Sequence, residues 1–392
     1  MSSFQKPVVT GLAAVVADPS LLGSVGSVGL LANQASVDLH YRSALELLDE
    51  VRPGLVKRVF SPQHGYGGEK QDNMIESAHG AVSDGRALYS LYGDKRKPSP
   101  EMLQGLEALL VDLVDVGTRV YTFAQTTALC LEACGEAGVQ VIVLDRPNPV
   151  GGLEVEGNVL DDDCVSFVGL HPVPMRHSLT IGELALFVNA RLAKPAKLTV
   201  IPLRGWNRSM HFQDTALNWV MPSPNMPVPE TASVYPGQVI WEGTNISEGR
   251  GTTRPFNLMG APFIEPGILY RDLLSFDLPG LALRPATFEP TFHKWSGQVC
   301  GGAELYPTDK SFKPFLTALT VMEIIFRRWP GALQLKEPPY EYEFVRRPID
   351  LILGRSSIFD ALRDGEKAAD ICRSFEKELA DFVRETKTIR LY

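Results

Sequence analysis

The sequence lacks the features of a membrane protein and of a nucleic-acid-binding protein. It contains no run of about 18 apolar residues, the length that a membrane helix needs. Basic residues form no long run and the formal net charge is −8, whereas binding to a polyphosphate requires a concentrated basic face. We therefore expect no membrane insertion and no nucleic-acid partner.

Cysteine is scarce and scattered, with five residues in 392. An odd, dispersed set does not suggest a disulfide framework. The first residues lack the apolar core of a signal peptide, so we expect a cytoplasmic protein, although an exported protein whose leader had been trimmed would look the same. The sequence carries no signal for a particular oligomeric state.

Several catalytic motifs are also missing. The glycines near residues 23 and 65 do not match the dinucleotide fingerprint or the P-loop, so we expect no cofactor. Neither a His-Glu-x-x-His motif nor a Cys-x-x-Cys pair occurs, and no Gly-x-Ser-x-Gly elbow is present. We expect no metal, yet His64, His177 and Asp115 could in principle meet around one, which leaves a metal-assisted hydrolase as an alternative.

The order of apolar runs and helical patterns predicts the fold class. Short apolar runs near residues 28, 56, 108 and 139 alternate with helical patterns, which is typical of a doubly wound α/β domain with a mainly parallel sheet. Beyond residue 262 the pattern changes to that of a smaller α+β domain. We therefore predict two domains, residues 1–265 and 266–392. In the second we expect helices over 313–328, 356–364 and 368–386, and strands over 287–292, 299–306 and 340–345.

Polar residues follow the apolar runs at their carboxyl ends, the edge of an open α/β sheet where ligands bind. These side chains could therefore converge although they are far apart in the sequence: Asn33, His64, Asp115, Arg119, Asp145, Arg146 and Asn148. Further along, Thr180 and Glu183 have the spacing of a capping box. That spacing gives Glu183 a structural explanation.

Residues 241–256, here called the glycine-rich segment, concentrate polar chemistry. The segment shows neither helical nor strand periodicity, and its glycines would let backbone N–H groups approach a ligand. Apolar residues flank it on both sides and would pull its ends inward. We predict a polar loop that lines a cleft; a solvated loop with internal salt bridges is the alternative.

With the cofactor, metal and serine-nucleophile motifs absent, catalysis by carboxyl groups is the remaining candidate chemistry. Cleavage of a glycosidic bond commonly needs one carboxyl group as acid and a second as base or nucleophile. Glu242 and Glu248 lie six positions apart across a glycine, and Asp115 follows a predicted strand. Each of the three could instead be only an ion-pair partner.

Several segments, in order, resemble one enzyme family. They are Ser-Pro-Gln-His-Gly (61–65), Asp-x-x-Asp-Val-Gly-x-Arg-x-Tyr-Thr (112–122), Leu-Asp-Arg-Pro-Asn-Pro (144–149), Arg-His-x-x-Thr-Ile-Gly-Glu (176–183), Pro-Ser-Pro-Asn-Met-Pro (222–227) and Glu-Gly-Thr-Asn-x-Ser-Glu-Gly-Arg-Gly-Thr-Thr (242–253). The family is that of the exo-β-N-acetylmuramidases, glycoside hydrolase family 171. Gln63 departs from it, because many members carry Glu there; Val114 and Ser178 replace a frequent Gln and a frequent Gly.

The resemblance implies a Rossmann-like domain holding the site and an enzyme that removes terminal N-acetylmuramic acid from the non-reducing end of peptidoglycan fragments. Because Gln63 cannot act as an acid, Glu242 and Glu248 become the stronger catalytic candidates, helped by Asp115 and His64. An arginine clamp would suit the lactyl carboxylate, and Arg119, Arg146, Arg250 and Arg254 are available for it. The predicted substrate contacts are Arg119, Tyr121, Asp145, Arg146, Asn148, His177, Asn225, Asn245, Arg250 and Thr252. A non-catalytic muropeptide-binding module is a further alternative, and the stereochemical outcome is open.

Overall fold

A computed structural model describes residues 6–71, 74–93 and 95–392. Its first part is a seven-stranded sheet in the order β3-β4-β2-β1-β5-β6-β9, in which every neighbouring pair is parallel except β3 and β4. The strands are β1 (Val28–Ala32), β2 (Val56–Ser61), β3 (Gly80–Ala81), β4 (Ala87–Ser90), β5 (Ala108–Asp112), β6 (Gln140–Leu144) and β9 (Leu198–Ile201). The predicted α/β class is confirmed.

Helices cover both faces of this sheet, which explains why its central strands β1, β5 and β6 are almost wholly buried and mainly apolar. In β5, Ala108 and Leu110 pack into the core beneath α1 and α2, whereas Leu109 and Val111 pack into the core on the side of α4 and α5. The bounds of these helices are α1 (Gly11–Ala17), α2 (Ala44–Val51), α4 (Thr122–Ala137) and α5 (Ile181–Asn189), with the short α3 (Pro100–Leu103) before β5.

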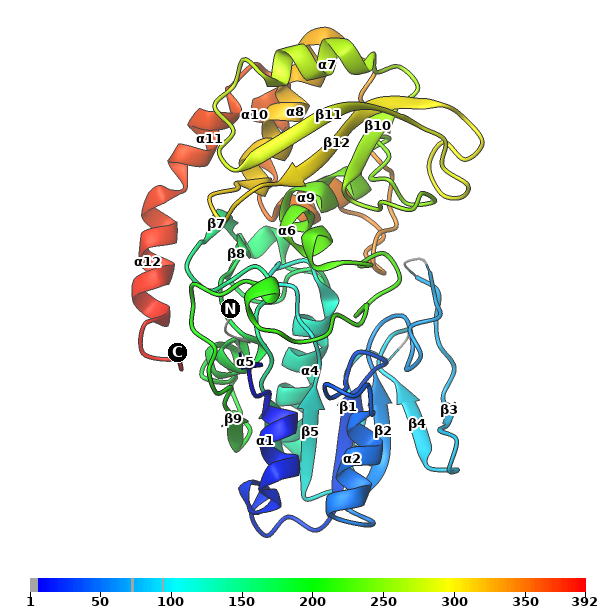
Figure 1. The fold of residues 1–392 in the computed structure, drawn as a ribbon, viewed down its shortest axis with the longest axis vertical. Coiled ribbons are helices and arrows are strands. Elements are labelled where there is room, and N and C mark those ends of the chain that lie inside the picture. The colour runs from blue at the N-terminus through cyan, green and yellow to red at the C-terminus, as the bar shows by residue number, and fades with distance from the viewer. Residues whose placement is uncertain (1–5, 72–73, 94) are drawn as a thin grey trace, which may run out of the picture.

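The strand order reverses between β1 and β5, since the chain runs from β1 outward to β2 and then returns to β5 on the other side of β1. Such a switch point leaves a crevice at the carboxyl ends of the strands. A two-stranded antiparallel sheet, β7 (Glu156–Val159) and β8 (Pro174–Arg176), lies between this domain and the rest of the chain (Figure 1).

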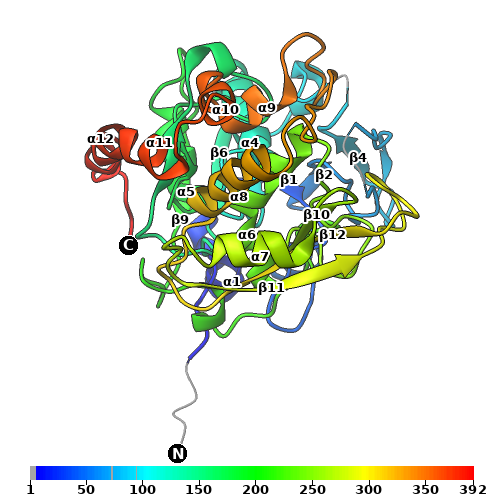
Figure 2. The ribbon, with the colours of Figure 1, turned by 90° about the horizontal axis from the view of Figure 1, so that it is seen from above.

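The second part contains an antiparallel sheet in the order β10-β12-β11 and several helices. Helix α8 lies beside α6, as Figure 2 shows from above. The elements are α6 (Pro229–Gln238), the 3-10 helix η4 (Val239–Gly243), β10 (Leu258–Ala261), α7 (Pro266–Leu273), β11 (Leu281–Phe288), β12 (Cys300–Pro307), α8 (Pro314–Arg328), α9 (Pro348–Leu353), α10 (Ser357–Arg363), α11 (Ala368–Ser374) and α12 (Glu376–Thr386). The boundary at 265/266 stays a prediction.

Three of the expected elements in this part were wrong. The strand expected over 287–292 is instead β11, which spans Leu281–Phe288, so residues 289–292 lie outside it. Residues 340–345 form a turn instead of a strand, with a single bridge between Tyr340 and Glu343 and positive φ angles at Glu341 and Tyr342. Residues 368–386 form two helices, α11 and α12, with a break at Phe375. Among the described residues, every helix is too short or too polar to cross a lipid bilayer.

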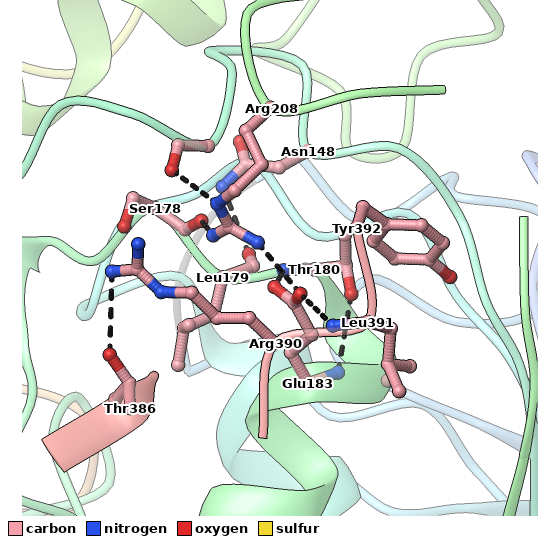
Figure 3. Close-up of polar contacts among 12 residues, drawn as sticks. Asn148, Ser178, Leu179, Thr180, Glu183, Arg208, Thr386, Arg390, Leu391 and Tyr392 are labelled. Atoms are coloured by element: carbon pink, nitrogen blue, oxygen red, sulfur yellow. Dashed lines mark hydrogen bonds and ion pairs between the residues drawn. The ribbon is translucent and has the colours of Figure 1, made fainter. Parts of the chain in front are cut away.

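The last residues of the chain return to the first domain and dock beside α5. Thr180 and Glu183 form the predicted capping box, and Glu183 also accepts hydrogen bonds from the Arg208 guanidinium and from the Leu391 backbone N–H (Figure 3). The Tyr392 hydroxyl donates to Asp145 at 2.7 Å and accepts from the Leu203 N–H at 2.8 Å. The C-terminal segment therefore holds together three regions of the sequence.

Tyr392→Phe should lower the free energy of unfolding by about 1–3 kcal/mol, because the Asp145 carboxyl group and the Leu203 N–H each lose the hydrogen bond to the Tyr392 hydroxyl. Burial raises the pKa of Asp145 to about 6, so the lost bond is to a charged carboxylate above that pH and to a neutral carboxyl below it. Urea unfolding should therefore show a larger loss at pH 8 than at pH 5. Tyr41→Phe, at an exposed tyrosine, is the control; an equal loss in both variants would contradict this account.

Candidate active site

One polar cavity lies where the carboxyl ends of the parallel strands meet the second domain. Its free volume is about 30 Å³, because the side chains that line it nearly fill it. Its lining residues come from the turn after β2, the start of α4, the proline-rich residues 222–227, α6, η4, the glycine-rich segment and the turn at 340. They are Gln63, His64, Val120, Tyr121, Thr122, Phe123, Val168, Ser223, Asn225, Met226, Tyr235, Glu242, Arg250, Phe256, Tyr340 and Glu341.

The glycine-rich segment was predicted to line a cleft, and its residues Glu242 and Arg250 do lie in the lining of this cavity. The segment is nonetheless mostly buried and is not an open loop. A Cβ on Gly243 would lie 2.7 Å from Cα of Ile349, and a Cβ on Gly251 would lie 2.6 Å from the backbone oxygen of Phe292. These two glycines therefore allow other parts of the backbone to pack closely against them. We had expected a ligand to approach their N–H groups instead.

Glu242 is held in place from two sides. Arg250 Nη2 donates to its Oε1 at 2.7 Å, and the Tyr340 hydroxyl donates to its Oε2 at 2.8 Å. Only 5% of Glu242 is exposed, and an ion pair of this kind is made with the charged form of the carboxyl group. The cavity therefore contains a carboxylate with a fixed orientation.

Glu248 lies behind Arg250 and not in the cavity lining. It is fully buried, with Lys294 Nζ at 2.7 Å from Oε2, and Arg250 Nε at 3.1 Å and His293 Nδ1 at 3.4 Å from Oε1. Burial by itself would raise the pKa of Glu248, but Lys294, His293 and Arg250 together bring that pKa well below its ordinary value. Glu248 thus anchors Arg250, which in turn orients Glu242.

Glu341 is a second carboxyl group in the cavity lining, and it is not among the residues predicted from the sequence. Its Oε1 accepts from the Gln63 amide at 3.1 Å and its Oε2 accepts from the Tyr92 hydroxyl at 2.7 Å. Burial raises the pKa of Glu341 to about 7, and the charge of Glu242 acts in the same direction. Two carboxyl groups with different hydrogen-bond partners therefore share one cavity.

His64, Asp115 and His177 do not form one cluster. His64 lines the cavity, and its Nδ1 lies 2.6 Å from the Lys70 carbonyl. Asp115 accepts from the Gly117 N–H and lies 3.3 Å from Nε2 of the buried His177, outside the cavity lining. Asp115 and His177 thus brace the turn that leads to Tyr121. In the part of the chain that the structure describes, no three His, Cys, Asp or Glu side chains gather closely enough to hold a metal ion.

Of the arginines predicted to clamp a carboxylate, Arg250 lines the cavity and the others do not. Arg119 is fully buried and donates to the carbonyls of Asn158, Val173, Ile352 and Leu353. Arg146 pairs with Asp112, and Arg254 pairs with Glu304. Their partners in the structure are groups of the protein itself, and their predicted contact with substrate stays a prediction.

The remaining predicted contacts also divide by position. Tyr121 and Asn225 line the cavity, and Asn225 Nδ2 donates to the Gln71 carbonyl. The others lie outside the lining and hold backbone groups. Asp145 accepts from the Gly182 N–H, Asn148 donates to the Leu179 carbonyl, Asn245 donates to the Ala332 carbonyl, and Thr252 donates to the Gly249 carbonyl.

A different cavity, of about 130 Å³, lies near the carboxyl ends of β1 and β5 but is lined mainly by apolar residues, including Val9, Leu39, Phe212 and Trp219. Asp38 is the one carboxyl group in its lining, so the cavity offers no pair of carboxyl groups. Arg146, also in the lining, is bound to Asp112. The smaller polar cavity is therefore the better candidate for hydrolysis.

Two family models together match nearly all of the chain. The N-terminal domain of the exo-beta-N-acetylmuramidase NamZ matches residues 28–230, and its C-terminal domain matches residues 233–392. The peptidoglycan beta-N-acetylmuramidase NamZ of Bacillus subtilis (strain 168) is 41% identical over 367 residues, which cover 93% of this chain and 86% of that protein.

Solved structures show the same architecture. A DUF1343 family protein of Bacteroides fragilis NCTC 9343 is 30% identical, with a TM-score of 0.88 over 98% of this chain and 99% of that one. A second DUF1343 family protein from the same organism is 25% identical, with a TM-score of 0.76 over 99% of both chains. The similarity therefore extends over both parts of the fold.

Proposed function

Because the chain belongs to the exo-β-N-acetylmuramidase NamZ family, we propose that it is a glycoside hydrolase that releases terminal N-acetylmuramic acid from the non-reducing end of peptidoglycan fragments. The observation that carries the proposal is the polar cavity with its two carboxyl groups, Glu242 and Glu341. Hydrolysis of a glycosidic bond commonly uses such a pair.

The cavity lining supplies the other groups that an N-acetylated sugar requires. Thr122, Ser223 and Asn225 offer hydroxyl and amide groups, and Tyr121 offers an aromatic face. Arg250 is the predicted carboxylate-binding arginine that reaches the cavity. In this proposal Glu242 acts on the anomeric centre. Glu248 is a positioning residue that acts through Arg250, and Asp115 is one that acts through the turn before Tyr121.

The test uses two synthetic disaccharides that differ in their non-reducing sugar. With N-acetylmuramic acid at that end we expect release of the free sugar, and with N-acetylglucosamine at that end we expect none, as measured by mass spectrometry. The rate should be unchanged by a chelator. Release from the second disaccharide, or binding of the first without turnover, would contradict the proposal, and loss of activity on chelation would favour a metal-assisted hydrolase.

A further inference from the structure

The turn at residues 340–343 places the side chains of Tyr340 and Glu341 in the cavity lining. Glu341 and Tyr342 have φ angles of 48° and 64°, a region that residues with side chains occupy at a cost in conformational energy. Tyr340 and Glu341 are each 3% exposed. Strain of this kind persists where the surrounding contacts determine the conformation, and here Glu341 is held by hydrogen bonds from Gln63 and Tyr92.

The two cavity carboxyl groups differ in their hydrogen-bond donors. Glu242 accepts from a guanidinium and a phenol, whereas Glu341 accepts from an amide and a phenol. The Gln63 amide that contacts Glu341 also accepts a hydrogen bond from the Thr122 hydroxyl, so its orientation is fixed. Gln63 itself has no acidic proton to give.

The surroundings of Glu341 favour a proton on it near neutral pH. Burial raises the pKa of Glu341 to about 7, the charge of Glu242 adds to this, and the hydrogen bonds from Tyr92 and Gln63 act in the opposite direction. The titratable or charged groups that face it are Tyr92, Arg96, Tyr235, Glu242, Tyr340 and Tyr342. A pKa near the working pH suits a general acid.

We propose that Glu341 donates the proton to the glycosidic oxygen, and that Gln63 and Tyr92 are the residues that position it. This proposal rests on the proposed function. It assigns different tasks to two carboxyl groups of one cavity: Glu341 acts on the leaving saccharide, and Glu242 acts on the anomeric centre.

The step balances as a hydrolysis. The bond between the anomeric carbon and the glycosidic oxygen breaks, its electron pair stays with the oxygen, and the Glu341 proton moves to that oxygen, so the saccharide leaves as an alcohol. Water then supplies the new oxygen on the anomeric carbon, and one of the two carboxylates takes up its proton. No oxidant or other co-reactant is needed.

Glu341→Gln should show an effect that depends on the leaving group. On the disaccharide, whose leaving alcohol needs a proton, kcat/KM should fall by about 10²–10⁴-fold. On a muramide with a dinitrophenyl leaving group, which departs without a proton, kcat/KM should stay close to that of the unchanged enzyme, because kcat/KM reports the step in which the bond breaks. This second result also shows that the variant is folded.

Equal losses on the two substrates, or full activity on the disaccharide, would overturn the proposal. If the unchanged enzyme hydrolyses neither substrate, the proposed function itself is wrong. If the unchanged enzyme hydrolyses both, and Glu341→Gln shows equal losses or full activity on the disaccharide, only the role of Glu341 is rejected. The two failures are therefore distinguishable.

Tyr92→Phe supplies a second readout that a purely structural role would not give. Tyr92 donates to Glu341, a bond that lowers the pKa of Glu341. Removing it should raise that pKa, so the alkaline limb of the kcat/KM profile on the disaccharide should move to higher pH. Tyr89→Phe is the control, because Tyr89 packs on Phe60 and is not in the cavity lining. An unmoved limb, or the same shift in both variants, would contradict the proposal.

Discussion

Glu242→Gln should lower kcat by roughly 10³-fold or more on both the disaccharide and the dinitrophenyl muramide, because it removes the carboxylate that acts on the anomeric centre. That centre is the same in the two substrates, so a better leaving group should not rescue the variant. The substitution keeps the size of the side chain, and Arg250 and Tyr340 still border it. Release of free sugar under saturating substrate gives the measurement.

Glu304→Gln is the matched control for this prediction. Glu304 is also 5% exposed and is also bound by arginines, Arg254 and Arg284, but it is not in the cavity lining. It should therefore retain turnover. Full activity in the Glu242 variant would end the assignment of Glu242, and an equal loss in the Glu304 variant would show that the loss reflects a disturbed fold.

Lys294→Met should lower the free energy of unfolding by about 3–5 kcal/mol, the usual effect of breaking a buried ion pair from one side. Lys294 Nζ donates to Glu248 and also to the carbonyls of Trp241 and Ile246. Removing it leaves a buried carboxylate with fewer opposing charges. Urea unfolding at pH 7 measures the loss, and Lys310→Met, which breaks an exposed pair with Asp214, should change stability by no more than about 1 kcal/mol.

The same variant should show a weaker dependence of stability on acid. The pKa of Glu248 is lower in the folded protein than in the unfolded chain, so its contribution is present above the unfolded pKa and is lost as the pH falls toward the folded one. Without Lys294 the folded pKa rises and this contribution shrinks. An unchanged pH dependence and an unchanged stability would show that Lys294 does not sustain the buried charge of Glu248.

The fold was the more predictable part of this molecule. Apolar runs such as Ala108–Val111 are buried on both sides by helices, and a pattern of that kind depends only on local sequence. The capping box at Thr180 was predictable for the same reason. The turn at 340–343 was not, because its alternating residues look like a strand and its shape depends on contacts with distant residues.

The site was predictable only in part. The strand-end rule predicted His64, and the glycine-rich segment supplied Glu242 and Arg250 to the same cavity. Tyr121 and Asn225, which also line it, were predicted as substrate contacts from the family resemblance. Glu341 was missed because its hydrogen bond to Gln63 joins residues 278 positions apart, and no motif marks it. A charged side chain in a motif does not by itself mark a substrate contact. Arg119 donates a hydrogen bond to the Leu353 carbonyl, and Arg146 forms an ion pair with Asp112.

The central claim is that Glu242 and Glu341 flank the bond that is cut. A crystal structure of the Glu242→Gln protein with a disaccharide whose non-reducing sugar is N-acetylmuramic acid tests this most directly. We predict the glycosidic oxygen at about 3 Å from the Glu341 carboxyl group, a hydrogen-bond distance, with the anomeric carbon facing residue 242. A saccharide bound in the apolar cavity near Trp219, or one whose glycosidic oxygen points away from Glu341, would contradict the claim.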